Sequence, residues 1–372
     1  MKHWLVSAPS EGGQGAYEMM REKLETKLGI GSVYPFRIPA FRVGTLDSLM
    51  ALSDTLTKHD HAIEQVVDRL LRQYRDLSKK PDIVPLVEFV ELPKYLHNFE
   101  WDEAKFSSGD TLEEIESAVM ELVARTEDDL KIRLNDYTTT KQAVAGIERR
   151  NQGNLMTKSL VGIVKEDEYL ETEHMRTVFI VVPSYNLDEF LSSYESLAAM
   201  VIPRSAKVLT SDSDYALVSV TLFKKCEEEF KVACRERRFT VRDFKFKADD
   251  IQASEEEYAR LRTELEDQHV NFVKWCETIF GEAVIAQMHL KAVRSFVESV
   301  LRYGLPVNFE VAMILPQAKA ESRLRAALQE MYGHLGGNWA SSSEKDGETT
   351  AIPGIAQEDF YPYVFSFLNI QT

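Results

Sequence analysis

The chain has 372 residues, 44% of them hydrophobic and 10% aromatic, so it holds enough apolar material for two or three folded domains and is not disordered throughout. Its formal net charge of −16 argues against general nucleic-acid binding, which needs a dominant basic face. No apolar run approaches the roughly 18 residues that span a bilayer, and the three cysteines are odd in number and lack metal-ligand spacing. We therefore expect a cytoplasmic chain without disulfides, bound metal or cofactor.

The first part of the chain alternates short strands with helices. Residues 4–9 predict a strand, a glycine-rich loop around residues 12–15 leads into a helix, and residues 33–38 predict a second strand. A cap at residues 45–47 starts a longer helix, in which apolar residues recur at helical spacing as far as Leu77. Prolines then mark an irregular connection at Pro81, Pro85 and Pro93.

Two long stretches without proline predict very long helices. Residues 94–182 and 204–305 contain none. Proline costs about 3 kcal/mol inside a helix and glycine about 1, so these stretches permit unbroken helices over residues 111–152 and 254–303. Apolar residues follow steps of three and four along both helices, which is typical of helices packed along a narrow seam. At about 1.5 Å per residue they form rods of roughly 60 to 75 Å, which must protrude from one domain or join two.

Between the rods the pattern changes to short strands and helices. We expect, in chain order, strand 176–183, helix 187–200, strands 206–210 and 215–223, helix 227–237 and strand 239–246. This β-α-β-β-α-β order is the split βαβ arrangement of ferredoxin-like folds. After the second rod we expect strand 308–315, helix 319–332, a polar loop at 333–354 and an aromatic strand at 361–370.

The predicted fold class is α+β, an elongated dumbbell of two α/β lobes joined by a long antiparallel two-helix neck. Two rods with one insert between them form a hairpin, so the two outer ends of the chain should build one shared lobe. The expected divisions are a foot lobe at 1–125, a first neck helix at 126–160, a head lobe at 161–250, a second neck helix at 251–280, and the rest of the foot lobe at 281–372.

No catalytic motif is present in the sequence. It contains no glycine-rich phosphate loop ending in Lys-Ser/Thr, no Gly-x-Ser-x-Gly elbow and no His-Glu-x-x-His pair. The glycine clusters at residues 12–15 and 333–337 are better explained as turns than as phosphate cradles. His59 and His61 flank Asp60, but alternate positions on a helix face different directions, which argues against a shared metal. We therefore expect a chain that is not itself catalytic.

A polar stripe interrupts the apolar second rod and is the first candidate site. It consists of Lys291, Arg294, Glu298 and Arg302. Arg294 and Glu298, like Glu298 and Arg302, are four residues apart and can form a charge ladder. The stripe is either an ordinary solvated helix face or a docking surface for a partner of the foot lobe.

A basic region in the predicted head lobe is the second candidate site. Residues 224–247 hold nine basic and five acidic residues, a local charge of +4 in a chain of −16. The region is either an ordinary charged surface or a positive patch that steers an acidic partner and speeds encounter. The candidate partner-binding residues here are Lys224, Lys225, Arg237, Arg238 and Arg242.

Several sequence blocks resemble the C subunit of the vacuolar-type proton-pumping ATPase (V-ATPase). The longest is VESVLRYGLPVNF at residues 297–309, which looks like a signature of that family. Further similar blocks, in the order of the family, are WLVSAP at 4–9, VGTLD at 43–47, the segment at 148–160, VIPRSAKVL at 201–209, VTLFKK at 220–225, FTVRDF at 239–244 and YPYV at 361–364. The resemblance covers essentially the whole chain, and its departures fall at residues 11–32, 79–92 and 341–356.

The resemblance implies a soluble stator subunit of a rotary proton pump. Family members have a head, a helical neck and a foot. The head grips a peripheral stalk made of the E and G subunits, and the foot meets a second such stalk and the cytosolic domain of the membrane-embedded a subunit. The family is also associated with reversible separation of the soluble and membrane sectors. This implies a chain held peripherally on the cytosolic face of vacuolar or other endomembranes through the complex.

Two hypotheses from other classes stay open beside the stator. One is a cytoskeletal adaptor that cross-links filaments, since actin binding has been attributed to some family members. The other is a nucleotide-dependent enzyme that uses the glycine loops. Actin co-sedimentation would favour the first, and turnover by the isolated chain would favour the second.

Overall fold

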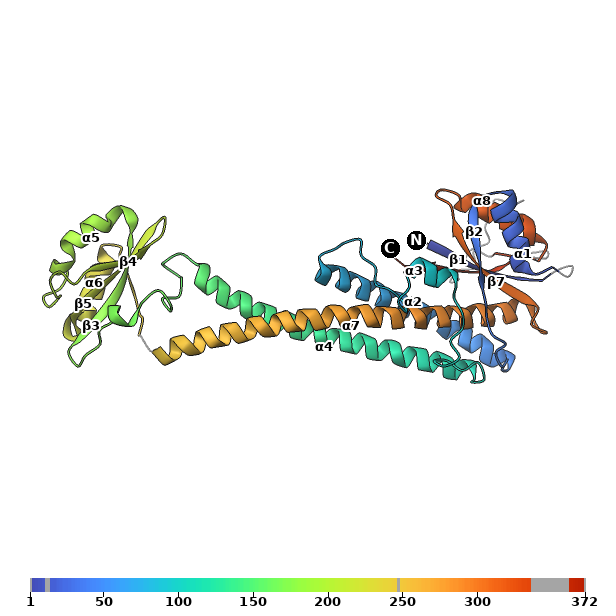
Figure 1. The fold of residues 1–372 in the computed structure, drawn as a ribbon, viewed down its shortest axis with the longest axis horizontal. Coiled ribbons are helices and arrows are strands. Elements are labelled where there is room, and N and C mark those ends of the chain that lie inside the picture. Colours follow the sequence, from blue (N-terminus) through green and yellow to red (C-terminus); the bar gives the residue numbers. More distant parts are fainter. Residues whose placement is uncertain (1, 11–13, 246–247, 336–360, 371–372) are drawn as a thin grey trace, which may run out of the picture. The chain divides into compact units, whose positions relative to one another are not determined.

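The computed structural model describes residues 2–10, 14–245, 248–335 and 361–370 (Figure 1). The chain divides into two compact units. Unit 1 comprises Met1–Arg133 and Val270–Thr372, and unit 2 comprises Leu134–His269. Each unit has its own four-stranded sheet with helices packed on it, so the predicted α+β class is confirmed.

The sheet of unit 1 joins strands from both ends of the chain. Its order is β2-β7-β1-β8, and all neighbours are antiparallel. Trp4 of β1 lies opposite Ile314 of β7 on one side and Phe367 of β8 on the other. The bounds are Lys2–Pro9 for β1, Gly31–Phe36 for β2, Phe309–Pro316 for β7 and Val364–Asn369 for β8. The central strand β1 is buried on both faces, which explains its nearly continuous apolar sequence.

Short helices cover one face of this sheet. They are α1 (Ala16–Met20), the π-helical turn η1 (Arg21–Lys27) and α8 (Glu321–Tyr332). Trp4 and alternate residues of β1 and β7 point into a core that these helices complete with Met20 and Leu328. Figure 1 shows α1 and α8 together on this side of the sheet.

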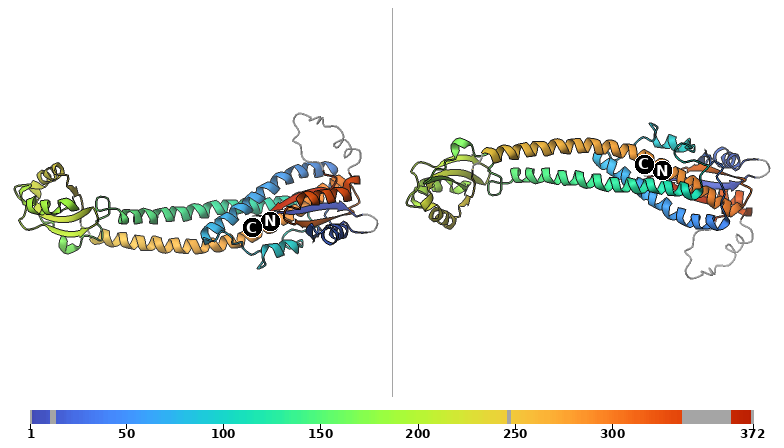
Figure 2. Two further views of the ribbon diagram at one scale, coloured as in Figure 1. Left: turned by 90° about the horizontal axis from the view of Figure 1, so that it is seen from above. Right: turned by 90° about the horizontal axis from the view of Figure 1, so that it is seen from below.

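Longer helices pack against the rest of unit 1, where α2, α4 and α7 run alongside one another (Figure 2). The bounds are Leu46–Ser78 for α2, Leu92–His97 for α3, Leu112–Gln152 for α4 and Ala248–Tyr303 for α7. The predicted start of α2 is confirmed, because the Thr45 hydroxyl accepts a hydrogen bond from the Ser48 N–H at 3.2 Å. Helices α4 and α7 each contribute residues to both units.

Helix α7 is the central element of unit 1. Every residue from 283 to 293 is buried, as expected for a helix that is apolar nearly all round. Near its end α7 contacts β1: the hydroxyl oxygens of Ser299 and Ser7 are 2.7 Å apart, and the Tyr303 hydroxyl donates to the Ser7 carbonyl at 2.7 Å. The predicted helix over residues 254–303 begins earlier than expected, at Ala248.

Unit 2 has the predicted element order β-α-β-β-α-β. Its sheet order, β4-β5-β3-β6, with antiparallel neighbours throughout, is that of a ferredoxin-like sheet. The bounds are Met175–Pro183 for β3, Leu187–Ser193 for α5, Lys207–Ser211 for β4, Tyr215–Phe223 for β5, Glu227–Glu236 for α6 and Thr240–Arg242 for β6. Helices α5 and α6 pack on one face, and the segment containing Leu155 and Leu160 covers the other.

Two predicted bounds in unit 2 are wrong. The helix predicted over residues 187–200 ends at Ser193, where a 3₁₀ turn follows. The hydroxyls of Ser192 and Ser193 donate to the Glu189 carbonyl, and such bonds weaken the end of a helix. The strand predicted over 239–246 spans only Thr240–Arg242, and residues 246–247 lie outside the described part of the chain.

Candidate partner-binding surfaces

The basic region of unit 2 is two exposed spots rather than one patch. Lys224 and Lys225 form a 3₁₀ turn just before α6, while Arg237 and Arg238 follow its last residue. Ten helical residues at 1.5 Å each separate the two spots by roughly 15 Å. The structure therefore brings each pair together and keeps the pairs at opposite ends of α6.

The first spot is partly neutralised by nearby carboxylates. The Lys224 ammonium lies 3.4 Å from Glu171, and both side chains are about two-fifths exposed. Lys225 is exposed. The first turn of α6 begins immediately afterwards with Glu227, Glu228 and Glu229, whose negative charge suits the positive end of the helix dipole.

The second spot is fixed by the end of α6. The Arg237 N–H donates to carbonyls of the last turn, and Arg238 takes a left-handed conformation with φ of 62°. Phe239 then enters the core, where it is 2% exposed. The two arginine side chains are exposed on either side of this chain reversal, so their guanidinium groups can meet a partner.

The remaining candidate in this region, Arg242, holds unit 2 together. Its guanidinium donates to the carbonyl of Leu155 at 2.8 Å and to that of Lys158 at 2.9 Å. These bonds fasten the segment that covers one sheet face to strand β6. Arg242 is half-buried, and its donors are committed to the backbone rather than offered to a partner.

An internal network absorbs another part of the positive charge counted from the sequence. The Lys231 ammonium lies 2.9 Å from Glu227 and 3.0 Å from Glu228, and these hydrogen bonds raise its pKa. Arg176 of β3 lies 3.2 Å from the same Glu227 carboxylate. Lys231 is therefore held by the carboxylates of α6 and is not a cation that unit 2 offers to a partner.

The polar stripe on α7 turns inward at its first two residues. The Lys291 ammonium and the Arg294 guanidinium both lie 2.6 Å from the Oδ2 atom of Asp60 on α2. The Lys291 side chain is 3% exposed and also donates to the Phe367 carbonyl of β8. Lys291 is thus neither a solvated face nor a surface that a partner can touch in this conformation.

The other two residues of the stripe lie closer to solvent. Glu298 accepts a hydrogen bond from Arg294 Nε at 2.6 Å, which confirms the first step of the predicted charge ladder. Burial opposes the charge of Arg294, but Glu298 and Asp60 outweigh it and raise the pKa of the guanidinium. Arg302 is exposed and donates to the Tyr361 carbonyl at 2.7 Å, so it fastens the last strand segment to α7.

Two histidines of unit 1, His3 and His289, are buried in its core. His289 is fully buried: its Nδ1–H donates to the Ile285 carbonyl at 2.7 Å, and its Nε2 accepts from the Asp102 N–H at 3.0 Å. Burial lowers its pKa. His3 of β1 faces His97 at 3.4 Å between their Nε2 atoms. Among the described residues, no group of three or more histidine, cysteine or acidic side chains could hold a metal.

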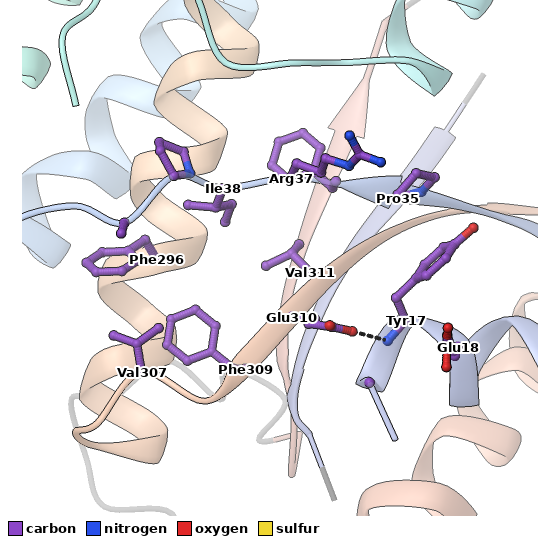
Figure 3. A pocket seen from close by; sticks show the side chains of 14 residues that line it. Tyr17, Glu18, Pro35, Arg37, Ile38, Phe296, Val307, Phe309, Glu310 and Val311 are labelled. Atoms are coloured by element: carbon purple, nitrogen blue, oxygen red, sulfur yellow. Dashed lines mark hydrogen bonds between the residues drawn. The ribbon is translucent and has the colours of Figure 1, made fainter. Parts of the chain in front are cut away.

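A groove of about 780 Å³ opens at the edge of the unit 1 sheet (Figure 3). Phe296, Phe309 and Val311 form its apolar wall, and Glu310 accepts a hydrogen bond from the Tyr17 N–H at 2.9 Å. A Cβ at Gly15 would lie 2.6 Å from the Glu310 carboxylate, which would have to shift to make room for it. The lining contains no histidine, cysteine, serine or threonine, and its polar side chains are Tyr17, Glu18, Arg37 and Glu310.

Comparisons with known proteins place these features in a family. A family model for the C subunit of V-ATPases matches residues 3–364. The chain is similar to the V-type proton ATPase C 1 subunits of Rattus norvegicus and Xenopus tropicalis and to the C 1-A subunit of Danio rerio. Each is 39% identical over 370 residues, which cover 97% of this chain and 96% of the relative.

The chain also aligns with a solved structure. It is the cytoplasmic N-terminal domain of the I subunit of a V-ATPase, a homologue of the a subunit. The alignment covers 90% of this chain and 98% of that one at 14% identity, with a TM-score of 0.30, which is too low to assign a shared fold. Within the residues that the structure describes, no helix has both the length and the apolar character needed to cross a bilayer.

Proposed function

Because the chain belongs to the family of V-ATPase C subunits, we propose that it is a non-catalytic stator subunit in the soluble sector of this proton-transporting ATPase. The observation that carries the proposal is the match over nearly the full length of the chain and of its relatives. The presence of two folded units, each with its own core, supports a role in which one chain holds two partners.

In this role the chain resists torque. ATP hydrolysis elsewhere in the complex turns a rotor, so the catalytic head must be held against rotation. Unit 2 holds a peripheral stalk made of the E and G subunits, and unit 1 holds a second stalk and the cytosolic domain of the a subunit. Helices α4 and α7, which contribute residues to both units, carry load from one anchor to the other.

The exposed basic spots support the first anchor. Lys224 and Lys225 before α6, and Arg237 and Arg238 after it, make two separate contacts with an acidic stalk surface. In unit 1, the exposed Arg302 and the half-buried Glu298 stand at the margin of the second anchor. Lys291 and Arg294 support this anchor indirectly, because their ion pairs with Asp60 fix the position of α7 against α2.

Charged and polar contacts suit an attachment that must also be released. A large apolar interface would be close to permanent, whereas a modest polar interface allows reversible separation of the soluble sector. We therefore place the chain at the cytosolic face of vacuolar or other endomembranes while the pump is assembled, and in the cytosol after release.

Affinity purification of the tagged full chain from membranes and from cytosol tests the proposal. Recovery of the E, G and a subunits with the membrane-derived sample is expected. The cytosolic sample should contain the chain separated from the a subunit. If purified chain co-sediments with actin filaments, and no ATPase component is recovered from either fraction, the cytoskeletal adaptor replaces the stator.

A further inference from the structure

A two-residue turn in unit 1 holds a phenylalanine almost entirely in solvent. The side chain of Phe89 is 97% exposed, more than any other large apolar side chain that the structure describes. Val87 and Val90 flank the turn and exchange two backbone hydrogen bonds of 2.9 Å, so the turn is closed. We call residues 88 and 89, with these flanking valines, the 88–89 turn.

The backbone of the 88–89 turn is unfavourable for the residues that occupy it. Glu88 has φ of 50° and Phe89 has φ of 64°, the left-handed values that a tight type I′ hairpin requires at both positions. Such turns strongly prefer Asn-Gly, because side chains with a bulky Cβ substituent disfavour positive φ. A sequence selected for stability alone would place Asn-Gly here.

The 88–89 turn is anchored to the core of the unit. Val87 is completely buried, and the Leu86 carbonyl oxygen and Val87 Cα lie close to Gly281 of α7, at 3.5 and 3.7 Å from the position of a Cβ there. The Lys105 ammonium lies 3.0 Å from Glu282 of α7 and 3.9 Å from Glu88. Phe89 therefore projects from a fixed base.

The surroundings of Phe89 are acidic. Residues 81–103 contain six acidic residues and one lysine. A cavity of about 380 Å³ opens beside the turn and is lined by Glu88, Glu100 and Asp102, with Lys94 and Trp101. A large exposed aromatic side chain next to carboxylates can anchor an apolar contact, and the negative charge around it favours a basic partner over an acidic one.

We propose that the 88–89 turn is a docking knob for a basic protein surface. Phe89 enters an apolar pocket on the partner, and Lys or Arg side chains at the rim of that pocket face the carboxylates of Glu88, Glu100 and Asp102. The proposal rests on the proposed function, because the partner is another component of the same assembly. Buried aromatic anchors of this kind carry a large share of the affinity of protein interfaces.

The charge of the chain disfavours two other occupants. An anionic membrane surface repels an acidic segment, whereas membrane-binding aromatics are normally accompanied by Lys and Arg. A second copy would bring the same acidic face against a chain of net charge −16. A basic partner surface meets both the aromatic and the carboxylates favourably.

The deciding variant is the double substitution Glu88→Asn with Phe89→Gly in the full chain. Asn-Gly suits the turn, so the thermal midpoint should stay the same or rise, while recovery of the partner protein should fall roughly tenfold or more. Phe89→Ala should weaken recovery similarly. Met50→Ala, which removes another exposed apolar side chain of unit 1, should leave it unchanged.

A photo-crosslinking phenylalanine analogue at position 89 identifies what the knob touches. The expected product is an adduct with one other ATPase component, at a peptide rich in Lys and Arg. If the complex is recovered normally with the double variant and position 89 yields no such adduct, the docking proposal is wrong while the proposed stator function is unaffected. If no ATPase component is recovered even with wild-type chain, both the docking proposal and the stator function are wrong.

Membrane and self-association controls complete the test. Wild-type chain should not float with vesicles of phosphatidylcholine and phosphatidylserine, and it should sediment as a monomer. Phe89-dependent flotation, or a dimer that Phe89→Ala abolishes, would replace the protein partner with a lipid surface or a second copy.

Discussion

The ammonium of Lys291 on α7 lies 2.6 Å from the Oδ2 atom of Asp60 on α2, and both side chains are less than one-tenth exposed. The same oxygen is 2.6 Å from the Arg294 guanidinium, and Lys291 also reaches the Phe367 carbonyl of β8. One buried carboxylate therefore holds two cations and links α2, α7 and the sheet. Burying charges is costly unless they are paired, so this arrangement fixes where α7 lies rather than adding much net stability.

Replacing Asp60 by Asn should destabilise unit 1 strongly. The substitution leaves the buried Lys291 ammonium without its counter-charge, while Arg294 keeps Glu298, and removing one partner of a buried pair typically costs about 3–5 kcal/mol. Urea titration followed by tryptophan fluorescence measures the loss. All four tryptophans of the sequence fall within the residue ranges of unit 1, so the signal reports on that unit.

The matched control is an ion pair on the surface of the same unit. Arg125 pairs with Glu121 along α4, and both side chains are well exposed. Arg125→Gln should cost less than about 0.5 kcal/mol, because exposed pairs one turn apart contribute little. Equal urea midpoints for the Asp60 and Arg125 variants would contradict the structural role given to Asp60.

Unit 1 should lose stability in mild acid through His3. Burial, then the neighbouring His97 and the terminal amine, lower the pKa of His3 from 6.5 to about 4. Between pH 6.5 and 4 the unfolded chain binds a proton at His3 and the folded chain does not. The contribution of His3 to stability is therefore fully present above pH 6.5 and is lost as the pH falls toward 4. Linkage between proton binding and unfolding predicts that the free energy of unfolding falls by about 2 kcal/mol between pH 7.5 and 5.0.

Urea midpoints of wild type and His3→Leu at the two pH values check this. The variant should show a clearly smaller loss in acid, with a remainder from His97 and His289, whose pKa values are also lowered by burial. An unchanged pH dependence in His3→Leu would show that another group causes the acid sensitivity.

Elements set by local spacing could be predicted from the sequence. The long helices follow from the missing prolines and the repeating apolar residues, the start of α2 from its Thr45 cap, and the element order of unit 2 from its alternating strands and short helices. The family resemblance of the 297–309 block is confirmed by the matching family model. Each of these signals lies within a short window of the chain.

The side-chain contacts of the candidate sites could not be predicted in the same way. Lys291 looks like a solvated charge until Asp60, 231 positions away, is placed against it. Arg242 looks like surface charge because its acceptors are backbone carbonyls, which every residue has. The Phe89 turn has only a weak sequence signal, which is that Glu-Phe stands between Val87 and Val90 where a tight turn would favour Asn-Gly.

Two glycines should respond oppositely to alanine. Gly146 lies inside α4, and a Cβ there would meet no neighbouring atom within 4 Å, so Gly146→Ala should stabilise the helix by about 1 kcal/mol. A Cβ at Gly31 of β2 would lie 2.9 Å from the Leu315 carbonyl oxygen, so Gly31→Ala forces the backbone to move and should destabilise the protein. Thermal melts followed by circular dichroism compare the two.

Tryptophan fluorescence reports on unit 1, which contains Gly31, whereas the helical signal reports on both units and therefore also on Gly146 of unit 2. Gly146→Ala should raise the helical transition and leave the tryptophan transition unchanged. A lower melting temperature for Gly146→Ala would mean that a partner element approaches α4 more closely than the structure shows.

If unit 2 holds the stalk of E and G subunits as we propose, charge reversal at either end of α6 should weaken capture of that stalk. We expect Lys224→Glu with Lys225→Glu to reduce recovery, and Arg237→Glu with Arg238→Glu to reduce it separately. Because about 15 Å of helix lies between the spots, the two losses should combine nearly additively in free energy. Pull-downs at low and at high salt measure the effect, which screening should diminish.

Arg242→Lys separates binding from folding in the same unit. A lysine ammonium cannot hold the carbonyls of Leu155 and Lys158 together as the guanidinium does, so this variant should lower the melting temperature of unit 2 while keeping its charge. Its capture of the stalk below that temperature should equal wild type. If Arg242→Lys weakens capture as much as the charge reversals do, without any loss of stability, then Arg242 belongs to the interface and the two-spot description of α6 is wrong.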